Sequence, residues 1–232
     1  MKQQLIFILL INLGFHSSAI FAQQAQAVDT VDVREKYGLR VGIDLSKPAR
    51  TFIEKDYQGL ELTADYRLYE DIYLAGEIGN EQNVISEPNV TAFSKGSYIK
   101  LGGNYNFYEN WTGMQNLIFI GARYGFATFS NELREFSIYD RDPYFEPDVR
   151  TEDREYSNLT AGWLELQLGT KVEVLNNLYL GVHVQLKRMV NETEPTNFDN
   201  LYIPGFNRTY DGSSVGVGYG YSISYLIPLY KK

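Results

Sequence analysis

The sequence predicts an all-β fold, an eight-stranded antiparallel up-and-down transmembrane β-barrel. Three observations predict it. Apolar and polar residues alternate with period two along most of the chain, as in strands that have two different faces. Aromatic residues make up 15% of the chain and 20 residues are glycine, a composition that favours strands and tight turns. Short turns and long polar connections follow one another in strict order along the chain.

Composition excludes several classes of function. The 232 residues include 21 Lys and Arg against 29 Asp and Glu, a net charge of −8, whereas phosphate binding needs a basic face. The chain therefore has no predicted nucleic-acid partner. It contains no cysteine, which excludes disulfides, thiol catalysis and cysteine-ligated metals. We predict no cofactor, no metal-binding residue and no catalytic residue.

Residues 1–27 have the form of a secretory signal peptide. Lys2 supplies the positive start, Leu5 to Leu13 form an apolar stretch, and small residues permit cleavage after Ala22 or Ala27. A membrane anchor is the alternative, but the apolar stretch breaks at Gly14, short of the ~20 residues that span a bilayer. Residues 28–36 are then a periplasmic N-terminal segment. Residues 37–232 are one barrel domain, without a linker that would divide them.

Eight segments alternate in the manner of strands. In the second, Leu60, Leu62 and Ala64 face one way, while the interleaved residues, such as Glu61 and Asp65, face the other. The final strand ends near the C-terminus at Tyr230, and a terminal aromatic residue is typical of substrates of the outer-membrane insertion machinery. The eight predicted strands span residues 37–46, 59–68, 72–79, 97–107, 117–129, 159–174, 178–187 and 215–229.

The connections differ between the two ends of the predicted barrel. One rim has tight turns at residues 69–71 and 175–177 and a longer turn at residues 108–116. The other rim has long outer loops at residues 47–56, 80–96, 130–156 and 190–214. Short turns on one side and long polar loops on the other are typical of bacterial outer-membrane barrels. This pattern predicts an outer-membrane location with extracellular long loops and both termini in the periplasm.

Alternation alone leaves open which face is outside. In a soluble periplasmic lipocalin-like barrel the apolar face would line a lipid-binding cavity, whereas in a membrane barrel it would contact outer-membrane lipid. The polar face carries equal numbers of bases and acids, and such a balance suits an interior in which every charge needs a partner. We therefore favour the membrane barrel, monomeric and with a lumen plugged by side chains. The bases are Arg40, Arg67, Lys100, Arg123, Lys171 and Lys187; the acids are Asp44, Glu61, Asp65, Glu77, Glu165 and Glu173.

Aromatic residues of the apolar face cluster towards the two rims, as in the girdles of membrane barrels. The short-turn rim has Tyr66, Tyr105, Phe107 and Tyr225, and the long-loop rim has Tyr124, Phe126, Tyr219 and Tyr221. Ordinary strand propensity would also enrich these residue types.

Three segments of the chain resemble a domain-of-unknown-function family of exported bacterial outer-membrane β-barrels. They are residues 37–47 (YGLRVGIDLSK), 197–212 (NFDNLYIPGFNRTYDG) and 224–232 (SYLIPLYKK). The resemblance implies a bacterial envelope protein and brings no catalytic or binding residue with it. The architecture is also similar to small OmpX-like and OmpA-like barrels.

Few residues suggest chemistry. His183 is the only histidine after the leader, and with Ser222 or Ser224 it would suit a barrel-embedded lipid hydrolase. Its predicted position on the polar face argues against that alternative, because lipid would contact Val182 and Val184 instead. The chain is therefore predicted not to be an enzyme, and to act in a structural or surface-interaction role through its outer loops.

Two of the outer loops are distinctive. Residues 130–156 hold nine acids and four bases, and Asp140, Asp142, Glu146 and Asp148 could ligate calcium, although a solvated acidic loop is the simpler interpretation. Residues 190–214 hold aromatic residues around Pro204-Gly205, which form either an exposed recognition patch for an extracellular partner or a lid over the barrel mouth.

Overall fold

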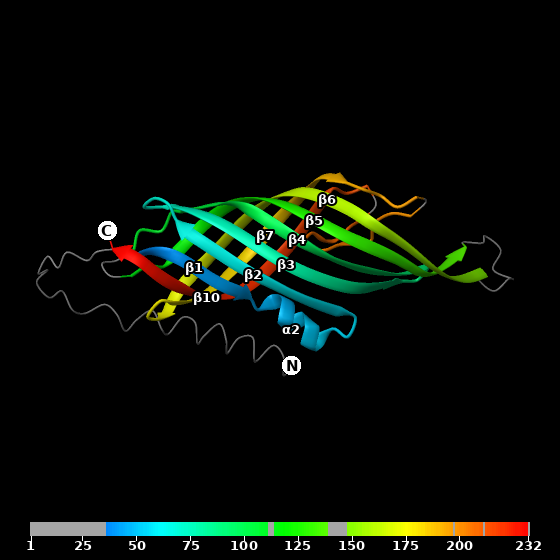
Figure 1. The fold of residues 1–232 in the computed structure, drawn as a ribbon, viewed down its shortest axis with the longest axis horizontal. Coiled ribbons are helices and arrows are strands. Elements are labelled where there is room, and N and C mark those ends of the chain that lie inside the picture. The colour runs from blue at the N-terminus through cyan, green and yellow to red at the C-terminus, as the bar shows by residue number, and fades with distance from the viewer. Residues whose placement is uncertain (1–35, 111–113, 139–147, 197, 211, 232) are drawn as a thin grey trace, which may run out of the picture. The chain divides into compact units, whose positions relative to one another are not determined.

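Eight long strands close into a barrel in the computed structural model, which describes residues 36–231 except 111–113, 139–147, 197 and 211 (Figure 1). The predicted signal peptide and residues 28–35 lie outside the described residues. The barrel strands are β1 (Lys36–Asp44), β2 (Tyr57–Arg67), β3 (Ile72–Glu87), β4 (Val90–Asn106), β5 (Leu117–Ile138), β6 (Asp148–Leu175), β7 (Leu178–Glu192) and β10 (Val215–Lys231).

The barrel is antiparallel and up-and-down, so the predicted fold class is confirmed. Each barrel strand pairs with the barrel strands before and after it, and β10 closes the ring by pairing with β1 from Lys36–Lys231 to Asp44–Ser222. In Figure 1 the last strand, in red, lies beside the first, in blue. Closure gives the backbone groups of both terminal strands a partner, which an open sheet would leave unpaired.

The predicted faces are also correct, with the apolar face outside. On β7 the alternate residues Leu180, Val182, Val184 and Leu186 are about half exposed, while the interleaved side chains are buried in the lumen. Aromatic residues of both predicted girdles lie on the same outer surface, for example Tyr105 and Tyr219. A lipocalin-like barrel requires the reverse, an apolar lumen and a polar exterior. The exterior therefore matches what a barrel in lipid requires.

Much of the sequence predicted as outer loop is strand or helix. β3 and β4 continue through residues 80–96 and meet at a turn between Glu87 and Val90, and β5 and β6 continue into residues 130–156. Residues 47–56 contain the helix α2 (Ser46–Ile53), and residues 190–214 contain a short hairpin, β8 (Tyr202–Ile203) with β9 (Asn207–Arg208). For the strand extensions the loop predictions were wrong because beyond the apolar band polar residues occupy both faces of a strand, so the alternation is lost.

The longest extension belongs to β5 and β6, which pair as far as Ile138 and Asp148 (Figure 1). β7 joins β6 only at the pair Ala161–Glu192. Among the described residues, β6 therefore pairs only with β5 before Ala161, apart from the Thr160 carbonyl, which accepts from the Thr193 amide over 2.8 Å. None of the helices among the described residues is long and apolar enough to cross a bilayer.

Candidate functional site

The lumen contains a network of buried charges centred on Lys100. Its Nζ lies 3.0 Å from an oxygen of Glu61, 2.8 Å from one of Glu77 and 3.9 Å from one of Glu165. These side chains come from four strands, because the strands of a narrow barrel direct alternate side chains at one axis. Only 1% of the Lys100 side chain is exposed, so the ammonium has exchanged its water for three carboxylates.

A second group of charges lies next to the first along the lumen. Arg123 donates to Asn104 Oδ1 over 2.8 Å, and its Nε lies 3.5 Å from Glu77. Gln167 donates to Glu77 over 3.1 Å and to Glu165 over 2.6 Å, which links the two groups into one network. Amides that bridge carboxylates in this way satisfy oxygens that the lysine does not reach.

The third group lies towards the short-turn rim. Asp65 contacts Arg40 Nη1 at 3.2 Å and Lys171 Nζ at 2.5 Å, and the Arg40 guanidinium lies over the Tyr179 ring at 4.2 Å. A cation–π contact of this kind supports a guanidinium away from bulk water.

Most of the twelve polar-face charges identified in the sequence meet inside the barrel. Arg67 and Glu173 lie at the short-turn rim instead, where Arg67 donates to the carbonyl of Glu70 and Glu173 accepts from the backbone of Asn177. Two buried charges were missed, Lys47 and Glu81, because both fall in segments interpreted as loops. The position of Glu81 could have been predicted, because it continues the row of alternate residues that holds Glu77 on the polar face. That row is Tyr73, Ala75, Glu77, Gly79 and Glu81. No comparable pattern indicates that Lys47 is buried.

His183 is buried in the lumen, as its strand face predicts. Its Nε2 lies 2.8 Å from Gln185 Nε2, and the described hydrogen bonds do not join it to Ser222 or Ser224. The two serines are themselves buried. The geometry of a nucleophile activated by a base is therefore not present among these three residues.

The mouth of the barrel on the long-strand side is filled by the β8–β9 hairpin. Its anchor is Glu81, a fully buried carboxylate that accepts from the Tyr202 hydroxyl at 2.6 Å, the Gly205 amide at 3.1 Å and the Tyr98 hydroxyl at 3.2 Å. Lys47 forms an ion pair with the same carboxylate. Burial, together with the negative charge of Glu81, raises the pKa of the Tyr202 phenol well above its ordinary value, so the hydroxyl stays a donor.

Opposite Glu81, a second anchor joins the hairpin to β7. Lys187 Nζ donates to the Gly205 carbonyl over 2.8 Å. Gly205 has a φ of +80°, and a Cβ at this position would lie 2.6 Å from the Tyr98 ring. Both the backbone conformation and the close ring therefore require glycine here.

Apolar packing also holds the hairpin against the barrel wall. Phe206 meets Trp163 edge to face with ring centroids 5.9 Å apart, and Ile203 and Phe129 belong to the same buried cluster. Of the two interpretations of residues 190–214, the lid fits Tyr202, Ile203 and Phe206, all of which are buried. Tyr210 is 59% exposed and is the aromatic residue of this segment that remains available at the surface.

The calcium hypothesis concerns residues that are largely not described. Asp140, Asp142 and Glu146 lie outside the described residues, as does the side chain of Asp148. Within the described part of the chain, no group of three or more His, Cys, Asp or Glu side chains is arranged to hold a metal ion.

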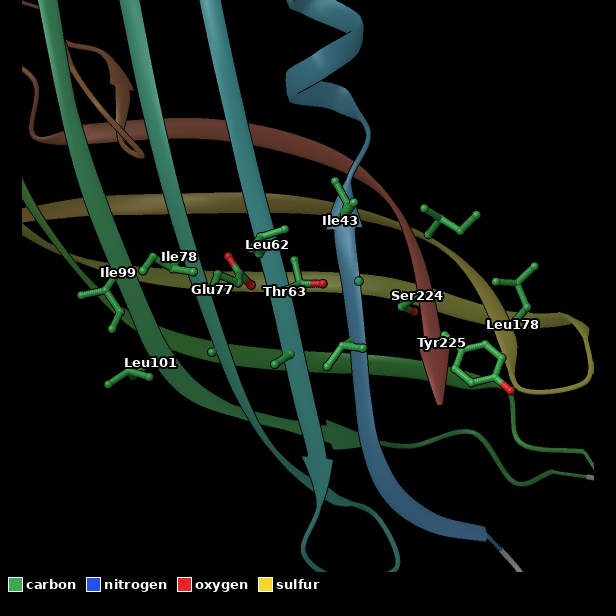
Figure 2. A pocket seen from close by; sticks show the side chains of 15 residues that line it. Ile43, Leu62, Thr63, Glu77, Ile78, Ile99, Leu101, Leu178, Ser224 and Tyr225 are labelled. Carbon is green, nitrogen blue, oxygen red and sulfur yellow. The ribbon is translucent and has the colours of Figure 1, made fainter. Parts of the chain in front are cut away.

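The outer surface carries an apolar groove of about 750 Å³ across β1 to β4 and β10. Figure 2 shows Ile43, Leu62, Ile78 and Ile99 along it, each from a different strand. The groove exists because the paired residues Ala64 and Gly76 are small where neighbouring rows carry Leu or Ile. It belongs to the apolar outer face, and the one charged residue among those that line it, Glu77, has its side chain buried with Lys100 in the lumen.

Comparison with known proteins gives a family and two similar folds. Neisserial surface protein A is 12% identical over 82% of this chain and 96% of its own, with a TM-score of 0.39. Ail, the attachment invasion locus protein of Yersinia pestis, is 11% identical over 83% of this chain and 98% of its own, with a TM-score of 0.36. No curated protein matches the sequence. Residues 1–232 match the family described as a domain of unknown function, DUF6048, and the chain belongs to that family.

Proposed function

We propose that the protein is a monomeric outer-membrane β-barrel of a Gram-negative bacterium, with a closed lumen and a non-enzymatic surface-interaction role. One observation carries the proposal: the charged side chains are buried inside the barrel and the apolar side chains are exposed outside it. In water this distribution would cost free energy on both faces, because charges would lose hydration and Leu, Ile and Val would gain it. In a bilayer the cost on the apolar face disappears because lipid covers it, and inside the barrel the buried charges are offset by their own ion pairs, such as those of Lys100 with Glu61 and Glu77.

The long-strand side would be extracellular and the short turns periplasmic, with both termini on the periplasmic side. β1 begins and β10 ends at the short-turn rim, where Tyr37 stacks on Tyr230 at 5.3 Å. A leader that is exported and cleaved would deliver the chain to the periplasm, from which the insertion machinery would recognise the aromatic end of β10. Protease added to intact cells is the test. We expect cleavage within the β5–β6 extension and protection of the short turns; cleavage at the short turns of intact cells would contradict this orientation.

A closed lumen is the second part of the proposal. The Lys100 network fills the middle of the barrel and the Glu81-anchored hairpin fills its mouth. An eight-stranded barrel has an interior only wide enough for side chains. Planar-bilayer recording of the purified protein tests this part. We expect no stable conductance steps, and porin-sized steps from pure protein would overturn it.

The interaction surface would lie on the β5–β6 extension, which reaches beyond the apolar band. Within the part of the chain that the structure describes, residues 155–159 of β6 have no strand pairing on the side away from β5, and such an edge can accept a strand from another protein. Capture of surface-exposed or host proteins by intact cells, with and without the extension, is the test. Equal capture by both strains would contradict a role for this edge.

The enzyme alternative keeps a direct test of its own. Replacing His183 by Ala, followed by lipid profiling of the envelope, separates a hydrolase from a surface protein. We expect an unchanged lipid composition, because His183 is buried in the lumen beside Gln185. An altered lipid composition with the barrel still inserted would favour the hydrolase.

A further inference from the structure

Helix α2 has its apolar side turned away from the protein. Leu45, which precedes it, and Ala49, Phe52 and Ile53 follow the spacing of one helical face, and all four are exposed. Phe52 is 90% exposed and Ile53 is 81% exposed. A surface helix in water normally shows the opposite arrangement, with its apolar stripe against the core.

The side of α2 that faces the barrel is polar, and its side chains form an ion pair and hydrogen bonds with the rest of the protein. Lys47 pairs with Glu81 in the mouth. The Thr51 hydroxyl donates to the Lys47 carbonyl over 3.1 Å and accepts from the Gly59 amide over 3.1 Å. These contacts fix the rotation of the helix, so the apolar side cannot turn inward without breaking them.

Arg50 fixes the same rotation from the other end of the helix. Its guanidinium lies 3.9 Å from the centre of the Tyr57 ring and forms two hydrogen bonds, of 3.1 and 2.9 Å, with Glu54. Hydrogen bonding to the guanidinium holds the pKa of the Glu54 carboxyl below its ordinary value, so the pair is ionised at neutral pH. The basic groups of α2 are thus occupied by the protein itself and do not form a free anion site.

The exposed stripe of α2 continues the lipid-facing surface of the barrel. Leu45 follows Val41 and Ile43 in the outward row of β1, and its amide donates to the Tyr221 carbonyl of β10. Beyond this point Val217 and Tyr219 of β10 lie beside the helix and line one small pocket with Lys47 and Arg50. The apolar band therefore continues from β1 onto the helix through Leu45, whereas the pocket between α2 and β10 is lined mainly by polar residues.

The neighbouring strands β3 and β4 indicate where the band ends. The two outward pairs above Ile78–Ile99 are polar, namely Asn80–Ser97, joined by a hydrogen bond of 2.9 Å, and Gln82–Lys95. On β2 the last apolar outward residue is Leu60, which pairs with Asn80. α2 contacts β2 at Tyr57 and Gly59, one step beyond that boundary. Helix α2 therefore lies at the edge of the apolar band on the long-strand side, where lipid acyl chains would meet headgroups.

We propose that α2 is an interfacial anchor whose Leu45, Ala49, Phe52 and Ile53 face lies among the lipid acyl chains of the outer leaflet. This inference rests on the proposed membrane barrel. The occupant is bilayer lipid, because the stripe continues through Leu45 from the outward row of β1, which lipid would cover, and all its apolar side chains are exposed. The anchor ties Lys47, and through it Glu81 and the mouth hairpin, to the membrane surface.

The absence of cysteine allows a direct test by site-directed spin labelling. Single variants Phe52→Cys and Ala49→Cys carry a nitroxide on the proposed lipid side of α2. Val182→Cys on β7 serves as the lipid-facing reference, and Thr151→Cys on the β6 extension serves as the aqueous reference; all four native side chains are exposed, so the labels do not disturb packing. The protein is reconstituted in phospholipid vesicles, and the accessibility of each label to oxygen and to a water-soluble nickel complex is measured.

We expect the oxygen-to-nickel ratio at positions 49 and 52 to lie between those of the two references and several-fold above that of position 151. A ratio at both positions equal to that of position 151 would overturn the anchor. Labels at positions 49 and 52 that neither reagent reaches, and whose spectra are broadened by spin–spin interaction, would also overturn it and would mean that a second copy of the chain covers α2. An oxygen-to-nickel ratio at position 182 as low as that at position 151 would contradict the membrane barrel as well as the anchor. A high ratio at position 182 with a low ratio at position 52 would contradict the anchor alone.

Discussion

Lys100 is the cation around which the interior charges of the barrel are arranged. Glu61, Glu77 and Glu165 approach the same ammonium from three other strands, so its removal would leave buried carboxylates facing one another. Breaking a buried ion pair by removing one partner is far more costly than omitting the pair altogether, because the remaining charge has neither water nor a counterion.

The Lys100→Met variant tests this arrangement. We expect it to lower the free energy of unfolding by about 3–5 kcal/mol, the cost of leaving a buried charge uncompensated. Lys95→Met is the matched control on the same strand, since Lys95 is exposed, and we expect a change within about 0.5 kcal/mol. Denaturant unfolding of both variants in lipid vesicles is the measurement. Equal midpoints for the two variants would show that the network does not stabilise the barrel.

Glu81 organises the mouth in the same way that Lys100 organises the lumen, with the charges reversed. Glu81→Gln keeps the size of the side chain and removes the charge that Lys47, Tyr202 and Gly205 share. We expect hydrogen exchange at the Gly205 and Phe206 amides to accelerate by about tenfold or more, because a hydrogen bond to a charged group contributes about 1.5–3 kcal/mol and 1.4 kcal/mol is a factor of ten.

The control for Glu81 is Glu87→Gln, which removes an exposed ion pair with Arg208 of the same hairpin. Exposed pairs contribute about 0–1 kcal/mol, so exchange at Gly205 should remain close to that of the unmodified protein. Faster exchange in the Glu87 variant than in the Glu81 variant would mean that the hairpin is held at its rim and not at Glu81.

At the scale of elements, period-two alternation identified eight strands and assigned their faces, but it did not find where the strands end. Alternation exists only where one face meets lipid and the other the lumen; in the extension of β5, polar residues occupy both faces and the contrast is lost. The β8–β9 hairpin and α2 could not be predicted for another reason. Their positions depend on Glu81, a partner more than 100 residues from Tyr202, and sequence pattern carries no such long-range information.

The β5–β6 extension is expected to be dispensable for folding. Asn131 and Tyr156 are register partners, so replacing residues 132–155 by Asn-Gly joins them through a two-residue hairpin turn. The barrel strands keep their pairings below this point, and we expect the variant to insert into the outer membrane with the heat-modifiable gel migration of a folded barrel. Aggregation of this variant, while a version with only residues 139–147 replaced still inserts, would show that the extension is needed for folding.

At the scale of the whole molecule, the separation of charges to the inside and apolar groups to the outside explains both the fold and the proposed location. The sequence predicted that separation from the balance of charges on the polar face, and the buried positions of Arg40, Asp65, Glu77 and Arg123 agree with it. What the sequence could not predict is how the charges pair, because each lumen group joins side chains from several strands whose register is set by closure of the barrel.

The most direct test of the account is a cysteine scan along β7 in lipid vesicles with brominated acyl chains. Single cysteines at Val182, Val184 and Leu186 are labelled with a fluorophore, and His183 and Gln185 are the interleaved positions. We predict that cysteines at positions 182, 184 and 186 label readily and that the brominated chains quench their fluorophores. Cysteines at positions 183 and 185 should resist labelling in the folded protein. Labelling of positions 183 and 185 by a water-soluble reagent, with no quenching at positions 182, 184 and 186, would contradict it and would mean that the charged face meets water outside the barrel.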